Sequence, residues 1–244
     1  MIYYAIIGDM IGSKGLENRA EVQKKLGSIL NQVSREYQED IASIFSITLG
    51  DEFQGLLKTA KNLMEIIDVI RFQIYPVELR FGIGVGEMST EVVYENSLGS
   101  DGPAYWAARE AIRYVHDEND YGASKMCIRR YEDKKQENAG KEPDDVEQLS
   151  KRMREVTLET MNLSLRLSDF QESRWTASQS EFIRALILKY HYQVNEHSQR
   201  EIAQEFGISA QLLNNKMKTT NVMTYIEAKQ SIQKLLRMEE KQWK

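Results

Sequence analysis

Hydrophobic and polar positions in the first 131 residues predict alternating strands and helices. Short apolar runs and period-two alternation are typical of strands, whereas apolar residues spaced three and four apart are typical of helices. A tight turn at Gly50 and Asp51 is expected to join two consecutive strands. These patterns predict strands at residues 2–7, 41–49, 53–57, 77–85 and 126–131, and helices at 16–37, 63–70 and 104–115.

The second half of the chain has a different pattern. Residues 132–145 are nearly all charged, amide, glycine or proline, so we predict a polar linker that buries no apolar area. Apolar residues at helical spacing predict a connecting helix at 146–173, without a heptad run sustained enough to predict a coiled coil. Residues 1–131 and 174–244 are therefore predicted to be two domains.

A helix-turn-helix is predicted at residues 199–218. Ser198 and Glu201 have the spacing of a capping box for its first helix. Gly207 suits the turn, and Ser209 can cap the second helix. The helices that complete this domain are expected at residues 180–190 and 225–238.

Composition and charge narrow the class of protein. The single cysteine, Cys127, excludes an intramolecular disulfide, and no Cys/His cluster has zinc spacing. No signal peptide or membrane span is evident at the first residues, so we expect a cytoplasmic protein without membrane contact. The net charge is −5, but residues 174–244 carry 11 Lys or Arg against 7 Asp or Glu, a net +4. This distribution is compatible with nucleic-acid contact through the C-terminal domain.

Two aspartates, Asp9 and Asp51, each follow a glycine at the end of a predicted strand. Mg²⁺ is commonly held by one or two carboxylates together with substrate phosphates, so the pair is a candidate site for Mg²⁺ or Mn²⁺. Gly12, Ser13 and Gly50 are candidate nucleotide-binding residues, because backbone N–H groups at such turns can cradle phosphates. A Gly-Asp pair is also ordinary turn chemistry, which is the competing interpretation of either pair alone.

The segments IIGDMIGS (6–13) and TLGDEF (48–53) resemble the two metal motifs of class III nucleotidyl cyclases, and the second also resembles the GGDEF signature of diguanylate cyclases. The segments LRFGIGVG (79–86) and GPAYWAAR (102–109) are similar to the cyclase strand and helix that follow. The full layout resembles the SatD family. This resemblance implies an α+β fold: a ferredoxin-like palm, an antiparallel sheet with helices on one face, followed by an all-α helix-turn-helix domain.

The same resemblance implies a site and its partners. Asp9 and Asp51 would bind metal and activate a hydroxyl, and Arg109 would stabilise the transferred phosphoryl group of a nucleoside triphosphate. Class III sites are completed across a homodimer, so a homodimer is expected. Tyr105 stands at the place of the cyclase catalytic asparagine and is expected either to contact a nucleotide or to belong to the core. Ile47 stands where ATP-specific enzymes carry a base-reading lysine.

These departures leave several functions open: a regulatory protein that couples a Mg²⁺-dependent nucleotide site to DNA binding, an active cyclase whose C-terminal domain serves assembly, and a degenerate palm scaffold. The second helix of the predicted helix-turn-helix presents amides that can contact adenine edges and lysines that can contact phosphates of double-stranded DNA. The candidate DNA-binding residues are Gln211, Asn214, Asn215, Lys216 and Lys218. A protein-docking role is the alternative for this domain.

Overall fold

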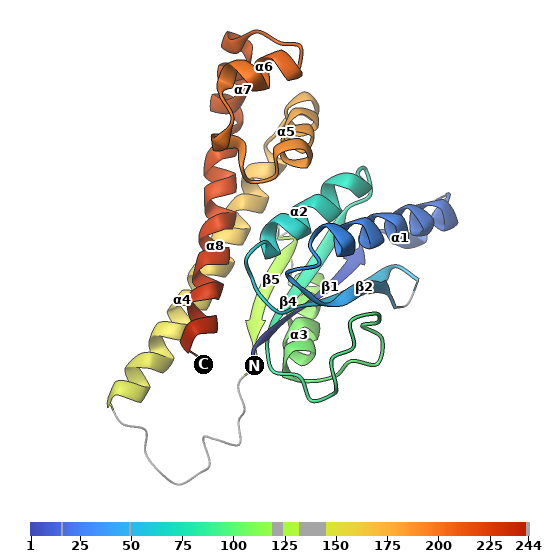
Figure 1. Ribbon diagram of the computed structural model, residues 1–244, viewed down its shortest axis with the longest axis vertical. Helices are drawn as coiled ribbons and strands as arrows, with labels where there is room; N and C mark the ends of the chain where they lie inside the picture. The colour runs from blue at the N-terminus through green and yellow to red at the C-terminus, as the bar shows by residue number, and fades with distance from the viewer. Residues whose placement is uncertain (16, 49, 119–123, 132–144, 243–244) are drawn as a thin grey trace.

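A computed structural model describes residues 1–15, 17–48, 50–118, 124–131 and 145–242 (Figure 1). Its N-terminal part is a five-stranded sheet with the order β2-β3-β1-β4-β5. The central strand β1 pairs antiparallel with β3 and β4, and β5 lies parallel to β4 at one edge. The strands are β1 (Tyr3–Met10), β2 (Ile41–Ile47), β3 (Glu52–Leu57), β4 (Leu79–Gly86) and β5 (Met126–Arg130).

Helices cover both faces of this sheet. On one face, Tyr4 and Ile6 of β1 share a core with α1 (Arg19–Glu36) and α2 (Leu63–Ile74). On the other, Ala5 and Ile7 pack with α3 (Pro103–Asp117). The antiparallel pairing that we expected holds for β1 to β4, but the expected placement of all helices on one face is wrong. The β4-α3-β5 segment is a crossover unit, which makes β5 parallel and places α3 on the second face.

Alternate glycines of β4 explain how α3 lies so close to the sheet. A Cβ atom added at Gly84 would lie 1.9 Å from the carbonyl oxygen of Ala104 on α3, and one added at Gly82 would lie 2.3 Å from that of Ala108. No side chain fits at either distance. The glycine pattern of residues 82–86 therefore has a packing cause, whatever the function of the chain.

The C-terminal part is helical. Its helices are α4 (Asp145–Ser173), α5 (Ala177–Tyr190), α6 (Gln199–Glu205), α7 (Ala210–Thr220) and α8 (Val222–Gln242). The Ser198–Glu201 capping box is present at α6, and the Ser209 side chain caps α7. Gly207, between these two helices, has a φ of 63°, a left-handed conformation that glycine adopts without strain. Two helices joined by a short turn are therefore present where a helix-turn-helix was predicted.

These helices pack against the sheet-bearing part of the chain. The long helices α4 and α8 run side by side, and α8 runs back beside the sheet (Figure 1). Gln233 of α8 accepts hydrogen bonds from the backbone N–H groups of Met64 and Glu65, in the first turn of α2. Nearby, Glu240 accepts one from Ala60 at 2.7 Å. Side chains of α8 thus provide acceptors for N–H groups that a helix N-terminus leaves unsatisfied.

The predicted domain limits stay predictions. Residues 132–144 of the expected linker lie outside the described residues, and apolar side chains of α5 and α8 share one core with α1 and α2. The connecting helix expected at 146–173 is present as α4. Among the described residues, no helix combines the length and apolar character needed to cross a membrane.

Candidate functional site

Three charged residues lie in a row across the sheet, at the end of β1. Asp9 of β1 is directly opposite Glu52 of β3 on one side and Arg80 of β4 on the other. Opposed residues of antiparallel strands project to the same face, so the three side chains are neighbours. The Nε atom of Arg80 donates a hydrogen bond of 2.9 Å to an Asp9 carboxylate oxygen. The Asp9 side chain is 23% exposed, which leaves it accessible to a small ligand.

Asp51 lies at the same edge, in the turn that precedes β3. Its backbone carbonyl accepts a hydrogen bond of 3.3 Å from the N–H of Met10, the last residue of β1. Its carboxylate accepts a hydrogen bond from the Ser13 hydroxyl, and the guanidinium of Arg19 at the start of α1 lies 3.8 Å away. Folding thus brings the ends of β1 and of the β2-β3 turn together with the first residue of α1.

Two glycines shape the backbone around these carboxylates. Gly12 and Gly50 have φ values of 69° and 63°, in the left-handed region where a side chain is strained. The Gly50 carbonyl accepts a hydrogen bond from the Gln23 side chain of α1. The space beside Gly12 is open: apart from its chain neighbours, no atom of the described residues lies within 4 Å of the position a Cβ would take. Both glycines were expected to bind nucleotide, and both lie at this edge.

The carboxyl of Asp9 has a shifted pKa at this edge. Burial raises the pKa of the Asp9 carboxyl above its ordinary value, Arg80 opposes the rise, and the negative charges of Asp51 and Glu52 add to it. Asp9 and Asp51 are therefore close enough to repel each other when both are ionised. A cation or a hydrogen-bond donor between them would relieve that repulsion.

The oxygen donors at this edge fit a divalent cation that is also bound by the phosphate oxygens of a nucleotide. Across the described part of the chain, no three His, Cys, Asp or Glu side chains are arranged as a ready-made metal site. The two carboxylates and the Ser13 hydroxyl are hard oxygen donors, which Mg²⁺ prefers. A Mg²⁺ ion takes only one or two protein carboxylates when a nucleotide supplies phosphate oxygens, so a larger protein cluster is not required.

The expected residues of α3 do not join this group. Tyr105 is only 1% exposed, with its ring packed between α3 and the sheet, so its expected contact with a nucleotide is corrected to a core role. Its hydroxyl has no hydrogen-bond partner among the described residues. Arg109, one turn later, is exposed, and none of the described hydrogen bonds or ion pairs connects it to Asp9 or Asp51. Ile47 is partly buried and packs against the main core.

The family follows from a comparison of the whole sequence. The sequence pattern of the SatD family matches residues 3–141 and 145–236, which is nearly all of the chain. The chain belongs to the SatD family. The SatD family predicted from the full layout of the sequence is thereby confirmed. No curated protein matches this SatD chain in sequence.

Solved structures of nucleotide cyclases are similar to part of the SatD chain. A crystal structure of a guanylyl cyclase is 17% identical, with a TM-score of 0.34, and the match covers 47% of this chain and 70% of that one. A bacterial light-regulated adenylyl cyclase is 12% identical, with a TM-score of 0.40, covering 52% of this chain and 74% of that one. Similarity at this level assigns no ligand or reaction to the SatD chain.

The candidate DNA-binding residues all lie on α7, but they are not equally accessible. Gln211, Asn215 and Lys218 are exposed, whereas Asn214 and Lys216 are partly buried. The ammonium group of Lys216 lies 5.2 Å from the centre of the Phe182 ring of α5. That distance is typical of a cation–π contact, so Lys216 also contributes to packing between the two helices.

Sequence reasoning missed the positive charges of the carboxylate edge. Arg80 was part of a recognised motif without an assigned partner, and Arg19 was not singled out. Strand alternation could have placed Arg80 on the face of Asp9, but only once the register of β1 with β4 was known. That register pairs residues such as Asp9 and Arg80, which are 71 positions apart, and no local pattern specifies it.

Proposed function

We propose that this SatD protein binds a Mg²⁺-nucleotide at the edge formed by Asp9, Asp51 and Ser13, and that binding is coupled to DNA contact by α6 and α7. The observation that supports it best is the combination of charges at that edge. Two partly exposed carboxylates lie beside the guanidinium groups of Arg80 and Arg19. Carboxylates suit a divalent cation, and guanidinium groups suit phosphate oxygens.

In this proposal Asp9 and Asp51 hold the metal, and Ser13 supplies a third oxygen. The bound Mg²⁺ would neutralise phosphate charge and orient the nucleotide. Arg80 is paired with Asp9 in the protein alone, so binding requires it to exchange the carboxylate for a phosphate oxygen. Arg19 is 47% exposed and can make the same contact with little rearrangement.

The residues of α3 favour a protein that binds the nucleotide without cyclising it. Tyr105 occupies the place where the resembled cyclases carry a catalytic asparagine, and its hydroxyl is buried away from the edge. It cannot orient a ribose hydroxyl from that position. Arg109 remains available to a phosphate group only if a ligand or a second protein copy approaches the outer side of α3.

A packed path connects the edge to the C-terminal helices. Strand β3 begins at Glu52 beside Asp51 and leads into α2, whose first turn is held by Gln233 of α8. Further along α2, Asp68 accepts hydrogen bonds from Tyr192 at 2.6 Å and Tyr225 at 2.8 Å. A shift of β3 on binding would therefore be transmitted through α2 to α8, which directly follows α7.

The DNA-binding part of the proposal depends on α7. Its exposed polar residues Gln211, Asn215 and Lys218 project from a helix that is capped by Ser209 and preceded by a short turn. This is the position of the recognition helix in helix-turn-helix proteins. The net +4 of residues 174–244 would add favourable electrostatics with phosphate.

Thermal unfolding with each nucleoside triphosphate, with and without Mg²⁺, tests the nucleotide site. A ligand that binds only the folded state raises the melting temperature. We expect a Mg²⁺-dependent rise for wild type that Asp9→Asn and Asp51→Asn abolish. Asp117→Asn, an exposed position at the end of α3, is the matched control and should keep the rise. Absence of a rise with all four triphosphates would contradict the proposal, and analysis of the mixtures for cyclic products would distinguish binding from catalysis.

A further inference from the structure

Helix α4 carries a row of exposed apolar side chains. Seven large ones are between 49% and 73% exposed: Val146, Leu149, Met153, Val156, Leu163, Leu167 and Phe170. Their spacing alternates between three and four residues, and exposed Thr160 fills the one position that continues the repeat. We name these eight positions the α4 stripe. The spacing is that of a and d positions in a heptad, sustained over more than three heptads.

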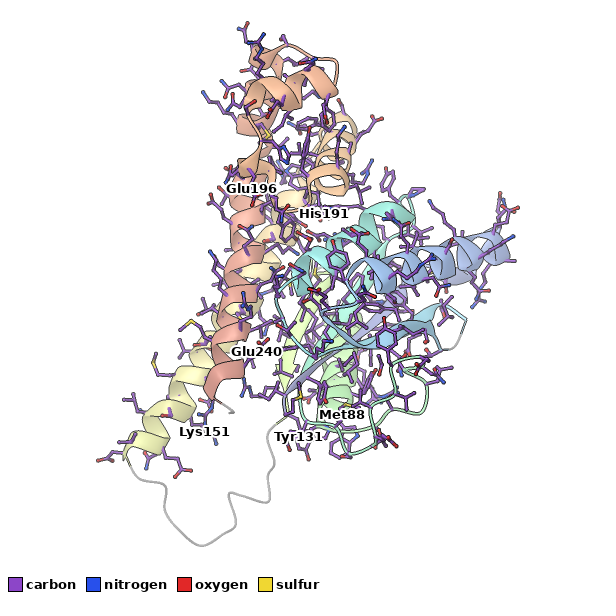
Figure 2. All side chains as sticks on the ribbon, in the orientation of Figure 1. Met88, Tyr131, Lys151, His191, Glu196 and Glu240 are labelled. Carbon is purple, nitrogen blue, oxygen red and sulfur yellow. The ribbon has the colours of Figure 1, made fainter. Side chains whose placement is uncertain are left out.

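The α4 stripe differs from the buried face that α4 uses within its own chain, and its middle residues border a cavity that is also lined by Tyr114 and Cys127. Met161 and Leu165 are buried, and Leu158 packs against the same core. Those residues face α8 and β5. Figure 1 shows the first turns of α4 extending past the end of α8, and Figure 2 shows Lys151 near this projecting end. A helix that is apolar on two faces needs a partner on each, and the described residues leave the α4 stripe largely uncovered.

We propose that the partner is the α4 stripe of a second copy of this chain, and that the two helices form a coiled coil. A repeat of 3.5 residues keeps facing its partner only when both helices supercoil, so the best match is another helix with the same repeat. A second copy supplies one of identical length. At roughly 100 Å² for each half-exposed large apolar side chain, seven such residues bury on the order of 700 Å² per subunit, close to a standard interface.

Charges beside the stripe favour a parallel arrangement. The charged residues flanking it on one side, at g positions, are Asp145, Arg152, Glu159 and Arg166, whereas the e positions hold Ser150, Thr157, Ser164 and Gln171. In a parallel coiled coil each g residue faces an uncharged e residue of the partner. In an antiparallel one with all eight layers filled, Arg152 would face Arg166 of the partner subunit, and the two Glu159 side chains would face each other. Like charges at those positions are destabilising.

A parallel pair has a consequence for the C-terminal helices. Helices α6 and α7 lie at the end of the molecule opposite the first residue of α4 (Figure 1). Two parallel copies would therefore present both α6-α7 units at the same end, as proteins that bind paired DNA half-sites do. The coiled coil itself does not rest on the proposed DNA or nucleotide binding, so its test is separate from theirs.

Sedimentation velocity on the full chain at micromolar concentration tests the dimer. We expect wild type to be a dimer and the double variant Leu149→Lys/Leu163→Lys to have a dissociation constant raised at least about a hundredfold, because four charges would enter the apolar seam. Glu155→Lys lies on α4 outside the stripe and should leave the dimer intact. Far-UV circular dichroism establishes that all variants are folded. A monomeric wild type, or a dimer that persists in the double variant, would overturn the proposal.

Cysteine cross-linking tests the orientation. The native Cys127 is buried, so it contributes little background. In a parallel pair, Leu163→Cys should form a disulfide with the same residue of the second copy. In the antiparallel pair, Leu163 instead meets Met153 of the partner subunit. Cross-linking found only in a mixture of Leu163→Cys and Met153→Cys chains would overturn the parallel arrangement.

Discussion

Arg80 and Asp9 face each other across β4 and β1, joined by a hydrogen bond of 2.9 Å between the guanidinium and the carboxylate. The aspartate expected to bind a metal ion is therefore already compensated in the protein alone. Asp51, the second expected ligand, is likewise engaged by Ser13 and lies 3.8 Å from Arg19. In the proposed complex, the cation would take the place of these donors on the carboxylates, and phosphate oxygens would take the place of the carboxylates on the arginines.

The pKa of Asp9 gives a pH prediction. Because partial burial raises that pKa above 3.8, the unfolded chain releases the Asp9 proton before the folded chain does as the pH rises. The free energy of unfolding therefore falls from pH 3.8 up through the folded-state pKa. Asp9→Asn removes this contribution. In chemical denaturation over that pH range, the free energy of unfolding of Asp9→Asn minus that of wild type should rise with pH. A difference that stays constant or falls would contradict a raised pKa for Asp9.

The buried hydroxyl of Tyr105 gives a stability prediction. It lacks a partner among the described residues, and leaving a buried polar group unsatisfied costs about 1–3 kcal/mol. Tyr105→Phe should therefore raise the free energy of unfolding, by about 1 kcal/mol. Tyr192→Phe is the matched comparison, because its hydroxyl bonds Asp68 at 2.6 Å, and this variant should lose stability. A loss in both variants would show that the Tyr105 hydroxyl has a partner.

Asp68 is the centre of a buried polar cluster between α2 and the C-terminal helices. It is fully buried, bonds Tyr225 and Arg71, and lies 3.9 Å from the ammonium of buried Lys229. Asp68→Asn leaves those cations with less compensating charge and should cost about 3–5 kcal/mol. In equilibrium denaturation, the double variant Asp68→Asn/Lys229→Met should lose less than the two single losses combined. Strict additivity would show that the two groups do not interact.

Lys218 tests the proposed DNA contact. It is exposed on α7. A lysine that contacts a phosphate adds about one to the slope of the logarithm of the binding constant against the logarithm of the salt concentration. Lys218→Ala should therefore weaken binding to mixed genomic fragments and reduce that slope by about one. Lys234→Ala, an exposed position on α8, should leave both unchanged. Wild-type binding that is absent at low salt would refute DNA contact altogether.

Much of the fold could be predicted from the sequence because its signals are local. The short apolar run of β1, the periodic residues of α3 and the caps Ser198 and Ser209 each specify their element from neighbouring positions. The placement of α3 on the second sheet face could not be predicted. A strand buried on both faces has the same apolar pattern whichever helices cover them.

The site was predicted less completely than the fold. Motif order placed Asp9 and Asp51 at one edge, but the partners of those residues depend on strand register and on where α1 begins. The α4 stripe was also missed. Thr160 interrupts the repeat, and the buried Met161 and Leu165 add a second apolar face that obscures the heptad in the sequence.

The most direct test of the Mg²⁺-nucleotide site is equilibrium dialysis of each labelled nucleoside triphosphate, with and without Mg²⁺. We expect wild type to retain at least one triphosphate only when Mg²⁺ is present, and Asp9→Asn and Asp51→Asn each to weaken retention about tenfold or more. Asp117→Asn should match wild type. Retention that is independent of Mg²⁺, or unchanged in both aspartate variants, would contradict the account.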